Sequence, residues 1–285
     1  MATGHAPSAV ARYYDGLTRY VGLASRLGLG SAEPLTMHRR LRDAAGAASG
    51  GRLHDILFAE IGPPAGRNLL DAGCGVGGTL IAWAEQGGRG RGITLSPVQC
   101  ARAAAAIARR GLAARCRVHC ASYDSDLHAL LDGDRFDAVI AIESLVHSRD
   151  PAATLANLAA MVAPGGRLAV VDDMPAADLA PDDGDLSAFQ RYWHAPGAMP
   201  AAALRAAIEA SGLRVAADRD LTAEIERRPP ARTRRLARLN RVVRRLVPSA
   251  PAGRVLDAHY GGLVLERLYA RGVMEYRLIV AAASA

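Results

Sequence analysis

The residues with the clearest chemical meaning are three closely spaced glycines that follow an acidic residue. The run NLLDAGCGVGG places Asp71 at the end of an apolar stretch, with Gly73, Gly75 and Gly77 directly after it. Glycine lets a backbone turn sharply and approach a ligand, because no Cβ stands in the way. The apolar run TLIAWA that follows predicts a helix whose first N–H groups would face that ligand. The spacing G-x-G-x-G differs from the dinucleotide pattern G-x-G-x-x-G, and a glycine-rich turn of another Rossmann-like protein is the alternative.

Two side chains that can accept a proton follow another apolar run. Glu143 comes directly after residues 136–142, and His147 lies four residues later. On a helical turn the two would share one face. A carboxylate at the carboxyl edge of a parallel sheet stands where such folds bind ligands, and either group can act as a general base. The alternative is structural: Glu143 caps a helix or pairs with an arginine, and His147 packs in the interior.

The elements that must position these residues alternate between strand and helix patterns at the length of βαβ units. The predicted strands are residues 68–71, 90–95, 116–120, 136–142 and 167–172, with a terminal strand at 274–283. The predicted helices between them are residues 79–86, 98–110 and 150–162. The sequence therefore predicts an α/β fold of the Rossmann-like kind, with a mostly parallel central sheet and helices on both faces, plus helical N-terminal and C-terminal caps.

The flanking segments predict the caps. Residues 1–60 are expected to form a helical N-terminal cap, and residues 61–285 the ligand-binding domain with lid or cap insertions at about 175–200 and 225–260. Within the second insertion, residues 229–247 have the pattern of a helix with arginines on its surface. The residues expected to form its single buried face are Leu236, Leu239, Val243 and Leu246.

Composition limits the class of protein. The 285 residues carry a formal charge of +7, and every basic residue is arginine. A GC-rich genome explains this most simply, and a nucleic-acid-binding role for the arginine-rich helix is the alternative, although that helix contains no aromatic residue. The four cysteines lack paired metal spacing, so no metal site is expected from them. Without a visible signal peptide or membrane span, the sequence predicts a cytoplasmic protein with reduced thiols.

The glycine loop, the run GITLSPVQ at residues 92–99 and the run AIESLVH at residues 141–147 together support a family assignment. The chain resembles the class I methyltransferases that use S-adenosylmethionine (SAM), in the branch of tocopherol, sterol, cyclopropane-fatty-acid and isoprenyl-diphosphate C-methyltransferases. The resemblance covers residues 55–175 strongly and extends weakly to residues 261–268, which look like the closing helix of that branch.

The resemblance implies a SAM site. Asp71 and the loop glycines would hold the methionine moiety, and Gln99 would replace the acid that often binds the ribose. Ser122 stands where the family usually has an adenine-binding Asp, which leaves Tyr123 or Asp124 as substitutes. The expected cofactor-binding residues are Asp71, Gly73, Gly75, Gly77, Thr94, Leu95, Gln99, Ser122, Tyr123 and Ile142.

The resemblance also implies a small, largely apolar acceptor from secondary metabolism, with C-methylation of an isoprenoid or other terpenoid as the leading expectation. Glu143 would then remove a proton from the carbocation that methylation of an alkene leaves. O- or N-methylation of a natural product with His147 as base is the alternative. Arg39 and Arg40 could bind a diphosphate, and Mg²⁺ is expected only for such an acceptor. The substrate-binding candidates are Tyr13, Tyr14, His38, Arg39, Tyr192, Trp193 and Tyr260, each of which could equally be a packing residue. No nucleic acid partner is expected, and whether the chain forms a homodimer or larger oligomer stays open.

Overall fold

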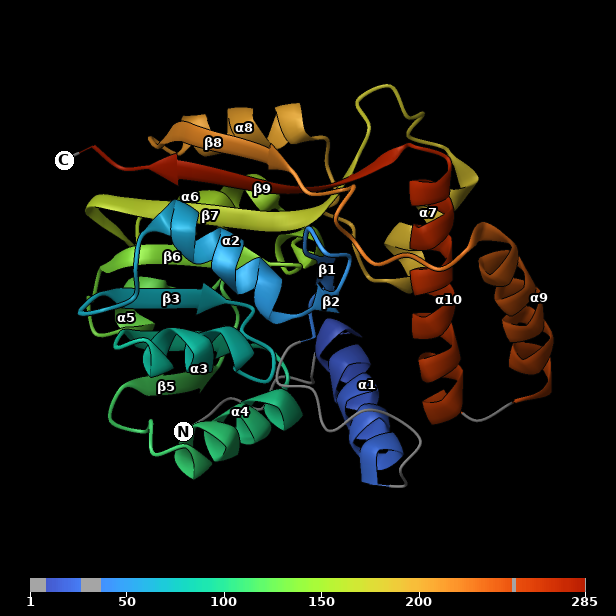
Figure 1. Ribbon diagram of the computed structural model, residues 1–285, viewed down its shortest axis with the longest axis horizontal. Coiled ribbons are helices and arrows are strands. Elements are labelled where there is room, and N and C mark those ends of the chain that lie inside the picture. Colours follow the sequence, from blue (N-terminus) through green and yellow to red (C-terminus); the bar gives the residue numbers. More distant parts are fainter. Residues whose placement is uncertain (1–8, 27–36, 248–249, 285) are drawn as a thin grey trace.

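Seven strands form one central sheet in the computed structural model, which describes residues 9–26, 37–247 and 250–284 (Figure 1). The strand order is β5-β4-β3-β6-β7-β9-β8. The strands from β5 to β7 run parallel, and β9 runs antiparallel to both β7 and β8. The strands are β3 (Asn68–Ala72), β4 (Arg89–Thr94), β5 (Cys116–Cys120), β6 (Phe136–Ile142), β7 (Val162–Pro175), β8 (Arg214–Asp220) and β9 (Met274–Ala282). The mostly parallel sheet is confirmed, whereas β8 is an additional strand that the sequence pattern did not predict.

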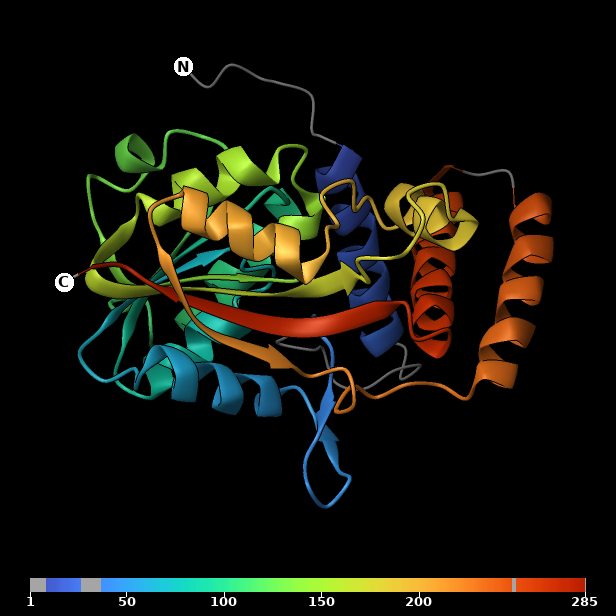
Figure 2. The same cartoon turned by 90° about the horizontal axis from the view of Figure 1, so that it is seen from above.

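Helices cover both faces of this sheet because successive side chains of a strand point to opposite sides. Leu69 and Leu70 of β3 accordingly belong to two separate apolar clusters. The first cluster includes α2 (Gly51–Ile61), α3 (Gly78–Glu85) and α4 (Pro97–Arg109), and the second includes α5 (Leu127–Leu130), α6 (Pro151–Ala159) and α8 (Ala201–Ala210). Figure 2 shows α2 and α8 on opposite sides of the sheet. The Rossmann-like fold predicted from the sequence is confirmed.

The N-terminal region is only partly helical. Helix α1 (Ala9–Arg26) and helix α2 are separated by a hairpin of β1 (Leu41–Arg42) and β2 (Ala48–Ser49). The hairpin turn forms because Asp43 accepts two backbone N–H hydrogen bonds, each 2.9 Å long, and Gly46 adopts a φ of +84°. Because α2 packs against β7 and β9, the end of the expected N-terminal cap belongs to the layer that covers the sheet.

A helical group stands at the other end of the molecule, on the right of Figure 1. Helix α10 (Ala250–Ala270) packs against α7 (Gly184–Tyr192), α9 (Pro230–Leu246) and α1. Helix α7 lies within the expected insertion at residues 175–200, and α9 lies within the expected insertion at residues 225–260. The division of the chain into domains stays a prediction.

Helix α9 is present, but its predicted buried face is only partly correct, since Leu236 and Val243 are half-buried. Its fully buried residues are the small Thr233, Ala237 and Asn240, whereas Leu239 and Leu246 are 57% and 75% exposed. The reason is that α9 packs closely against α10, and small side chains allow the two helices to approach each other. Hydrophobic spacing alone could not tell that face from the apolar positions beside it, because both have helical periodicity.

Candidate active site

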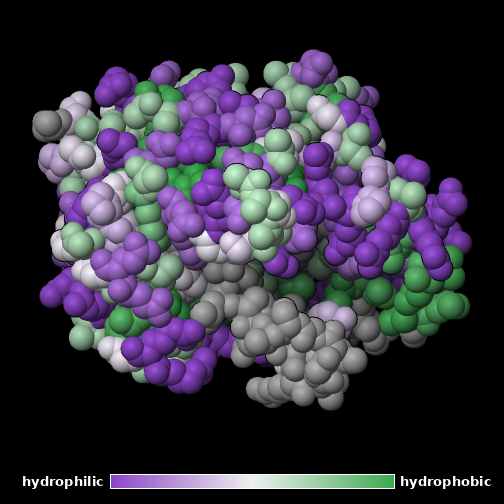
Figure 3. Space-filling model, in the orientation of Figure 1, coloured by the Kyte–Doolittle hydropathy of each residue, from purple (hydrophilic) through white to green (hydrophobic). Residues whose placement is uncertain are grey.

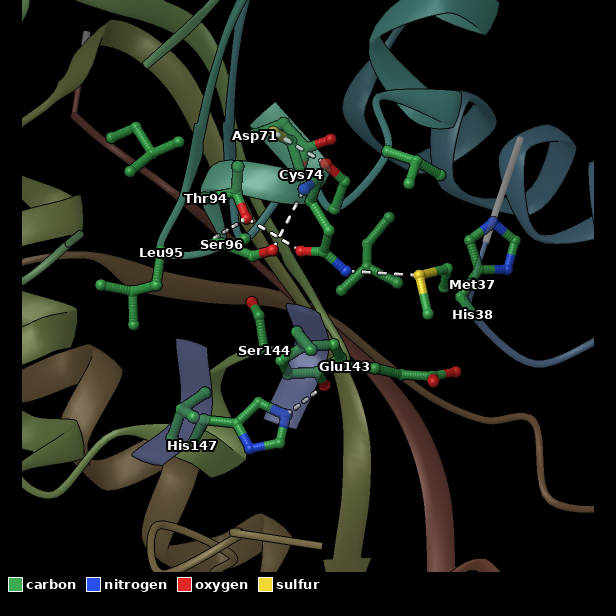
Figure 4. Close-up of a pocket in the computed structure, with 18 of the residues that line it drawn as sticks. Met37, His38, Asp71, Cys74, Thr94, Leu95, Ser96, Glu143, Ser144 and His147 are labelled. Atoms are coloured by element: carbon green, nitrogen blue, oxygen red, sulfur yellow. Dashed lines mark hydrogen bonds between the residues drawn. The ribbon is translucent and has the colours of Figure 1, made fainter. Parts of the chain in front are cut away.

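A cavity lies at the carboxyl ends of β3, β4 and β6, and residues of α1 also line it (Figure 4). The open space between its side chains is about 170 Å³. Most of the residues named from the sequence line it: Tyr13, Tyr14, His38, Asp71, Gly73, Gly75, Thr94, Leu95, Gln99, Tyr123, Ile142, Glu143, His147 and Trp193. The structure does not bring Gly77, Ser122, Arg39, Tyr192 or Tyr260 to this lining. The glycine loop and both proton acceptors thus share one cavity.

The three loop glycines serve different purposes, although each has a positive φ. A Cβ on Gly73 would lie 2.4 Å from the Cβ of Ser144, and one on Gly77 would lie 3.1 Å from the Cβ of Ala103. These two glycines are therefore needed for close packing. A Cβ on Gly75 would point into open space, with the nearest atom, Gln99 Nε2, at 3.9 Å. Gly75 is the position at which a ligand can lie against the backbone.

Asp71 supplies the acidic group of the loop. Its side chain is buried at the end of β3, and burial raises the pKa of its carboxyl to about 7. A cationic group of a ligand in the cavity would favour the ionised form of this carboxyl.

Gln99 is held toward the cavity by the start of α4. Ser96 caps this helix, because its Oγ accepts the backbone N–H of Gln99 at 3.1 Å. Thr94 Oγ1 donates to Gln99 Oε1 at 2.9 Å, and Gln99 Nε2 donates to the sulfur of Met37 at 3.3 Å. Ser122 instead accepts the backbone N–H of Asp124 at 3.0 Å, outside the cavity. The position of Gln99 is compatible with the ribose role that the resemblance implies, whereas that of Ser122 gives no support to an adenine contact.

His147 is a neutral, fixed base. Its ring Nδ1 lies 2.7 Å from the carbonyl oxygen of His194, which can only accept, so Nδ1 carries the proton and donates it. Nε2 is then the acceptor, and it receives the hydroxyl of Tyr14 at 2.6 Å. Burial lowers the pKa of His147 to about 4. The imidazole therefore presents an unprotonated nitrogen to a hydroxyl group at the cavity wall.

Glu143 lies on a different part of the wall. The φ of Glu143 is +48°, which is uncommon for a residue with a side chain. His147 belongs to the short 3₁₀ helix η1 (Leu145–His147), which begins after Glu143. The expectation that both side chains share one helical face is wrong, and Figure 4 shows them pointing in different directions. Glu143 Oε1 accepts the backbone N–H of Arg39 at 2.7 Å and the hydroxyl of Tyr276 at 2.8 Å. Burial raises the pKa of Glu143, although the Arg39 guanidinium opposes this shift.

Arg39 is already neutralised by the protein. Its Nε and Nη2 donate to the two oxygens of Asp173 at 3.1 and 3.3 Å, and the Asp173 side chain is buried. The ring of Tyr269 lies 5.1 Å from the guanidinium carbon. A paired, enclosed guanidinium of this kind is poorly placed to receive a diphosphate.

The other aromatic candidates divide between the cavity and the helical group. Trp193 lines the cavity, and α10 approaches it closely, since a Cβ on Gly262 would lie 3.0 Å from the indole ring. Tyr192 and Tyr260 instead pack against each other, with ring centroids 5.1 Å apart. Their contact joins α7 to α10, which explains why these two residues are not at the cavity.

The residues that line or support the site but were not predicted to belong to it include Asp15, Met37, Ser144, Asp173 and Tyr276. Asp173 carried a signal, because it belongs to an acidic pair where a predicted strand ends. Tyr276 and Met37 carried none, since only tertiary structure brings them to Glu143 and Gln99. Among the described residues, no group of three or more His, Cys, Asp or Glu side chains is arranged to hold a metal ion.

Residues 70–168 match the family model described as a methyltransferase domain. The chain is 32% identical over 128 residues to Methyltransferase GfsG from Streptomyces halstedii. The aligned residues cover 44% of this chain and 45% of that protein. The chain is also 30% identical over 165 residues to O-methyltransferase resE from Aspergillus sclerotiorum. These residues cover 58% of this chain and 61% of that protein. The chain thus spans about half the length of the curated relatives it matches.

Two solved structures superpose over nearly the whole chain. The [4+2]-cyclase SpnF gives a TM-score of 0.72 at 22% identity, covering 99% of this chain and 98% of its own. Geranyl diphosphate C-methyltransferase from Streptomyces coelicolor A3(2) gives 0.70 at 17% identity, covering 98% of this chain and 99% of its own.

The protein therefore shares its fold with this cyclase and with this C-methyltransferase. More specifically, residues 70–168 match a methyltransferase domain, and this match supports the resemblance to methyltransferases that the sequence motifs indicate. Within the described ranges, no helix is long and apolar enough to cross a membrane.

Proposed function

We propose that this chain is a SAM-dependent methyltransferase that methylates an oxygen of a small, largely apolar molecule. One solved neighbour is named as a cyclase, and a shared fold does not determine the reaction. The residues of the site must therefore carry the argument. The observation that carries it is the neutral His147, with Nδ1 fixed by a carbonyl oxygen and Nε2 hydrogen-bonded to a hydroxyl.

Three features of the cavity support the proposal that it binds SAM. Gly75 leaves open space against the backbone, the buried Asp71 suits an ammonium group, and Gln99 offers an amide toward the cavity. When bound, SAM supplies an already activated methyl group. The protein then has to exclude water, orient the acceptor and remove its proton.

His147 can do the last of these for a hydroxyl acceptor. The acceptor's hydroxyl takes the place of the Tyr14 hydroxyl on Nε2, or passes its proton to Nε2 through Tyr14. The lowered pKa makes His147 a weaker base than an ordinary histidine, but its Nε2 is unprotonated over the physiological pH range and is therefore available to accept that proton. The mainly apolar lining, which includes Leu17, Ile142 and Trp193, favours an acceptor with an apolar body.

C-methylation of an isoprenoid is the second candidate, and Glu143 favours it. A half-buried carboxylate in a strained backbone conformation at the cavity wall could stabilise a carbocation and remove its proton. In either case we propose an acceptor without a diphosphate, because Asp173 already neutralises Arg39. We therefore expect no requirement for Mg²⁺, and transfer should continue when a chelator is added.

Two matched variants decide between the candidates. His147→Ala should lower the turnover number by about 10²–10⁴, as is typical for loss of a general base. Glu143→Gln keeps the size and hydrogen bonding of the side chain and should cost much less. The measurement is transfer from labelled SAM to a panel of phenols, hydroxylated polyketides, prenylated phenols and prenyl diphosphates, with SAM affinity determined by calorimetry.

The opposite pattern, a large loss in Glu143→Gln with His147→Ala near the wild type, would assign the reaction to carbon. An absence of SAM binding by the wild-type protein would refute the methyltransferase proposal itself.

A further inference from the structure

The exposed apolar side chains of this molecule are concentrated on one helix. Among the described residues, four large hydrophobic side chains are exposed, and three of them belong to α9. These are Leu239, Val242 and Leu246, which are 57%, 54% and 75% exposed. Figure 3 shows hydrophobic residues at the right edge of the molecule, over α9, next to strongly hydrophilic ones. Single exposed apolar residues are ordinary, but a group on one element indicates a contact surface.

The three residues form a stripe along α9. Their spacing of three and four residues places them on one side of a helix, next to the face that packs on α10. Arg235 and Arg238 stand one turn before Leu239 and Val242 on the same rows. Guanidinium groups therefore stand at the N-terminal end of the stripe.

All charged side chains of α9 are positive. The helix contains seven arginines and no acidic residue. Arg244 is paired with Asp257 of α10 at 2.8 Å. Within the described ranges, no carboxylate pairs with the exposed Arg234, Arg235, Arg238 or Arg245. This part of α9 thus combines unpartnered cations with an apolar stripe and stands at the edge of the molecule (Figure 2).

We propose that α9 binds an anionic lipid surface, with Leu239, Val242 and Leu246 entering the boundary between headgroups and acyl chains and the flanking arginines contacting lipid phosphates. Apolar side chains and cations on adjacent sides of one helix are what an interfacial helix requires. The arginines complement the charge of the headgroups, and guanidinium binds phosphate in a two-pronged geometry. The attachment is peripheral and does not depend on which acceptor the cavity takes.

Two other occupants fit the surface less well. A second copy of the chain, related by a two-fold axis, would place the same arginines opposite each other, and like charges in such an interface repel. A nucleic acid would pair with the arginines, but it would leave the leucine and valine stripe without an apolar partner, and α9 has no aromatic side chain on which bases could stack.

Co-sedimentation with vesicles tests the proposal. The full-length protein should bind vesicles of equimolar phosphatidylcholine and phosphatidylglycerol, and should bind phosphatidylcholine alone much more weakly. The charge variant Arg235→Ser/Arg238→Ser should lower the partition coefficient by roughly thirtyfold, since each cation near an anionic surface contributes about a factor of five. The apolar variant Leu239→Ser/Val242→Ser/Leu246→Ser should also lose binding, while its Tm stays close to the wild type because all three side chains are exposed.

A matched control removes the same charge elsewhere. Arg109→Ser/Arg117→Ser changes two exposed arginines on α4 and β5 and should bind anionic vesicles within a factor of about three of the wild type, because these residues are remote from α9. The proposal is overturned if the wild type does not bind anionic vesicles, if both arginine pairs reduce binding equally, or if the apolar variant binds normally. Loss of a wild-type dimer in the apolar variant, seen by light scattering, would instead assign the stripe to self-association.

Discussion

Glu143 and His147 show how two proton acceptors in one cavity are given different properties. The carboxylate of Glu143 is held by the Tyr276 hydroxyl and the Arg39 backbone, and its residue adopts a φ of +48°. Such a conformation costs roughly 1–3 kcal/mol and persists where the surroundings fix it. His147 is instead kept neutral by burial and fixed by one carbonyl oxygen. The two groups are thereby suited to different tasks, one electrostatic and one basic.

At the same scale, Asp71 should make SAM affinity depend on pH. Its pKa is raised to about 7 by burial, so the carboxyl is mostly protonated at pH 6 and mostly ionised at pH 8. The ionised form attracts the ammonium of the methionine moiety, so the dissociation constant should fall as the pH rises, by up to about tenfold per unit below the pKa. Calorimetric titration between pH 6 and 8 measures this.

Asp71→Asn should bind SAM weakly and without that pH dependence. Asp178→Asn, at an exposed position, is the control and should behave as the wild type. An unchanged pH dependence in Asp71→Asn would show that another group is responsible.

At the scale of elements, the loop between β3 and α3 can be tested with two glycines that have the same backbone requirement. Gly75 and Gly111 have φ values of +52° and +68°, and an added Cβ would meet no atom closer than 3.9 Å at the first and none within 4 Å at the second. Valine at either position should cost a similar amount of stability, roughly 1–2 kcal/mol for left-handed backbone. Gly75→Val should abolish SAM binding, because its side chain enters the cavity, while Gly111→Val should retain it within about twofold of the wild type.

Calorimetry and urea unfolding of the same samples separate the two effects. Equal SAM affinity in both variants would remove this loop from the cofactor site.

The elements also show what the sequence could predict. The parallel strands and the glycine loop were predictable because burial on both faces and tight turns leave local patterns. Strand β8 lies at the sheet edge and has only exposed and half-buried residues, so its sequence pattern is weak. The buried side of α9 was only partly predicted because small and polar residues pack against α10 there. The contacts of Arg39 with Asp173 join residues 134 positions apart, and no local pattern encodes them.

For the whole molecule, two histidines should make stability fall in mild acid. The pKa values of His54 and His147 are each lowered to about 4, the first by burial and by His38, the second by burial. Between the unfolded pKa near 6.5 and the folded value, the unfolded chain binds protons that the folded protein does not, so stability rises with pH. From pH 7 to pH 5 the free energy of unfolding should fall by at most about 2 kcal/mol for each histidine.

Urea unfolding at pH 7, 6 and 5 gives this slope. His54→Gln and His147→Gln should each flatten it, whatever their effect on absolute stability, while His128→Gln, at an exposed position, should leave it unchanged. A pH-independent unfolding free energy in the wild type would contradict the expectation.

Two adjacent residues attach helix α1 to the wall of the cavity, and this attachment has a consequence for the time course of the reaction. Tyr14 is hydrogen-bonded to His147, and Asp15 Oδ1 accepts from Ser96 Oγ at 2.5 Å and from the Val98 N–H at 3.3 Å. With α1 in place the open space is smaller than the roughly 300–1,000 Å³ of typical ligand pockets. Cofactor exchange should therefore wait for α1 to move, so that departure of the spent cofactor sets the turnover rate.

Rapid mixing of enzyme, SAM and acceptor should then give a burst of methylated product equal to the enzyme concentration, followed by a slower steady rate. Asp15→Ala should shorten the residence time of the spent cofactor by about tenfold or more, since hydrogen bonds to a charged group contribute roughly 1.5–3 kcal/mol. Arg19→Ala, at an exposed position of the same helix, should leave it unchanged. A linear time course without a burst would mean that methyl transfer itself is slow and that α1 opens freely between turnovers.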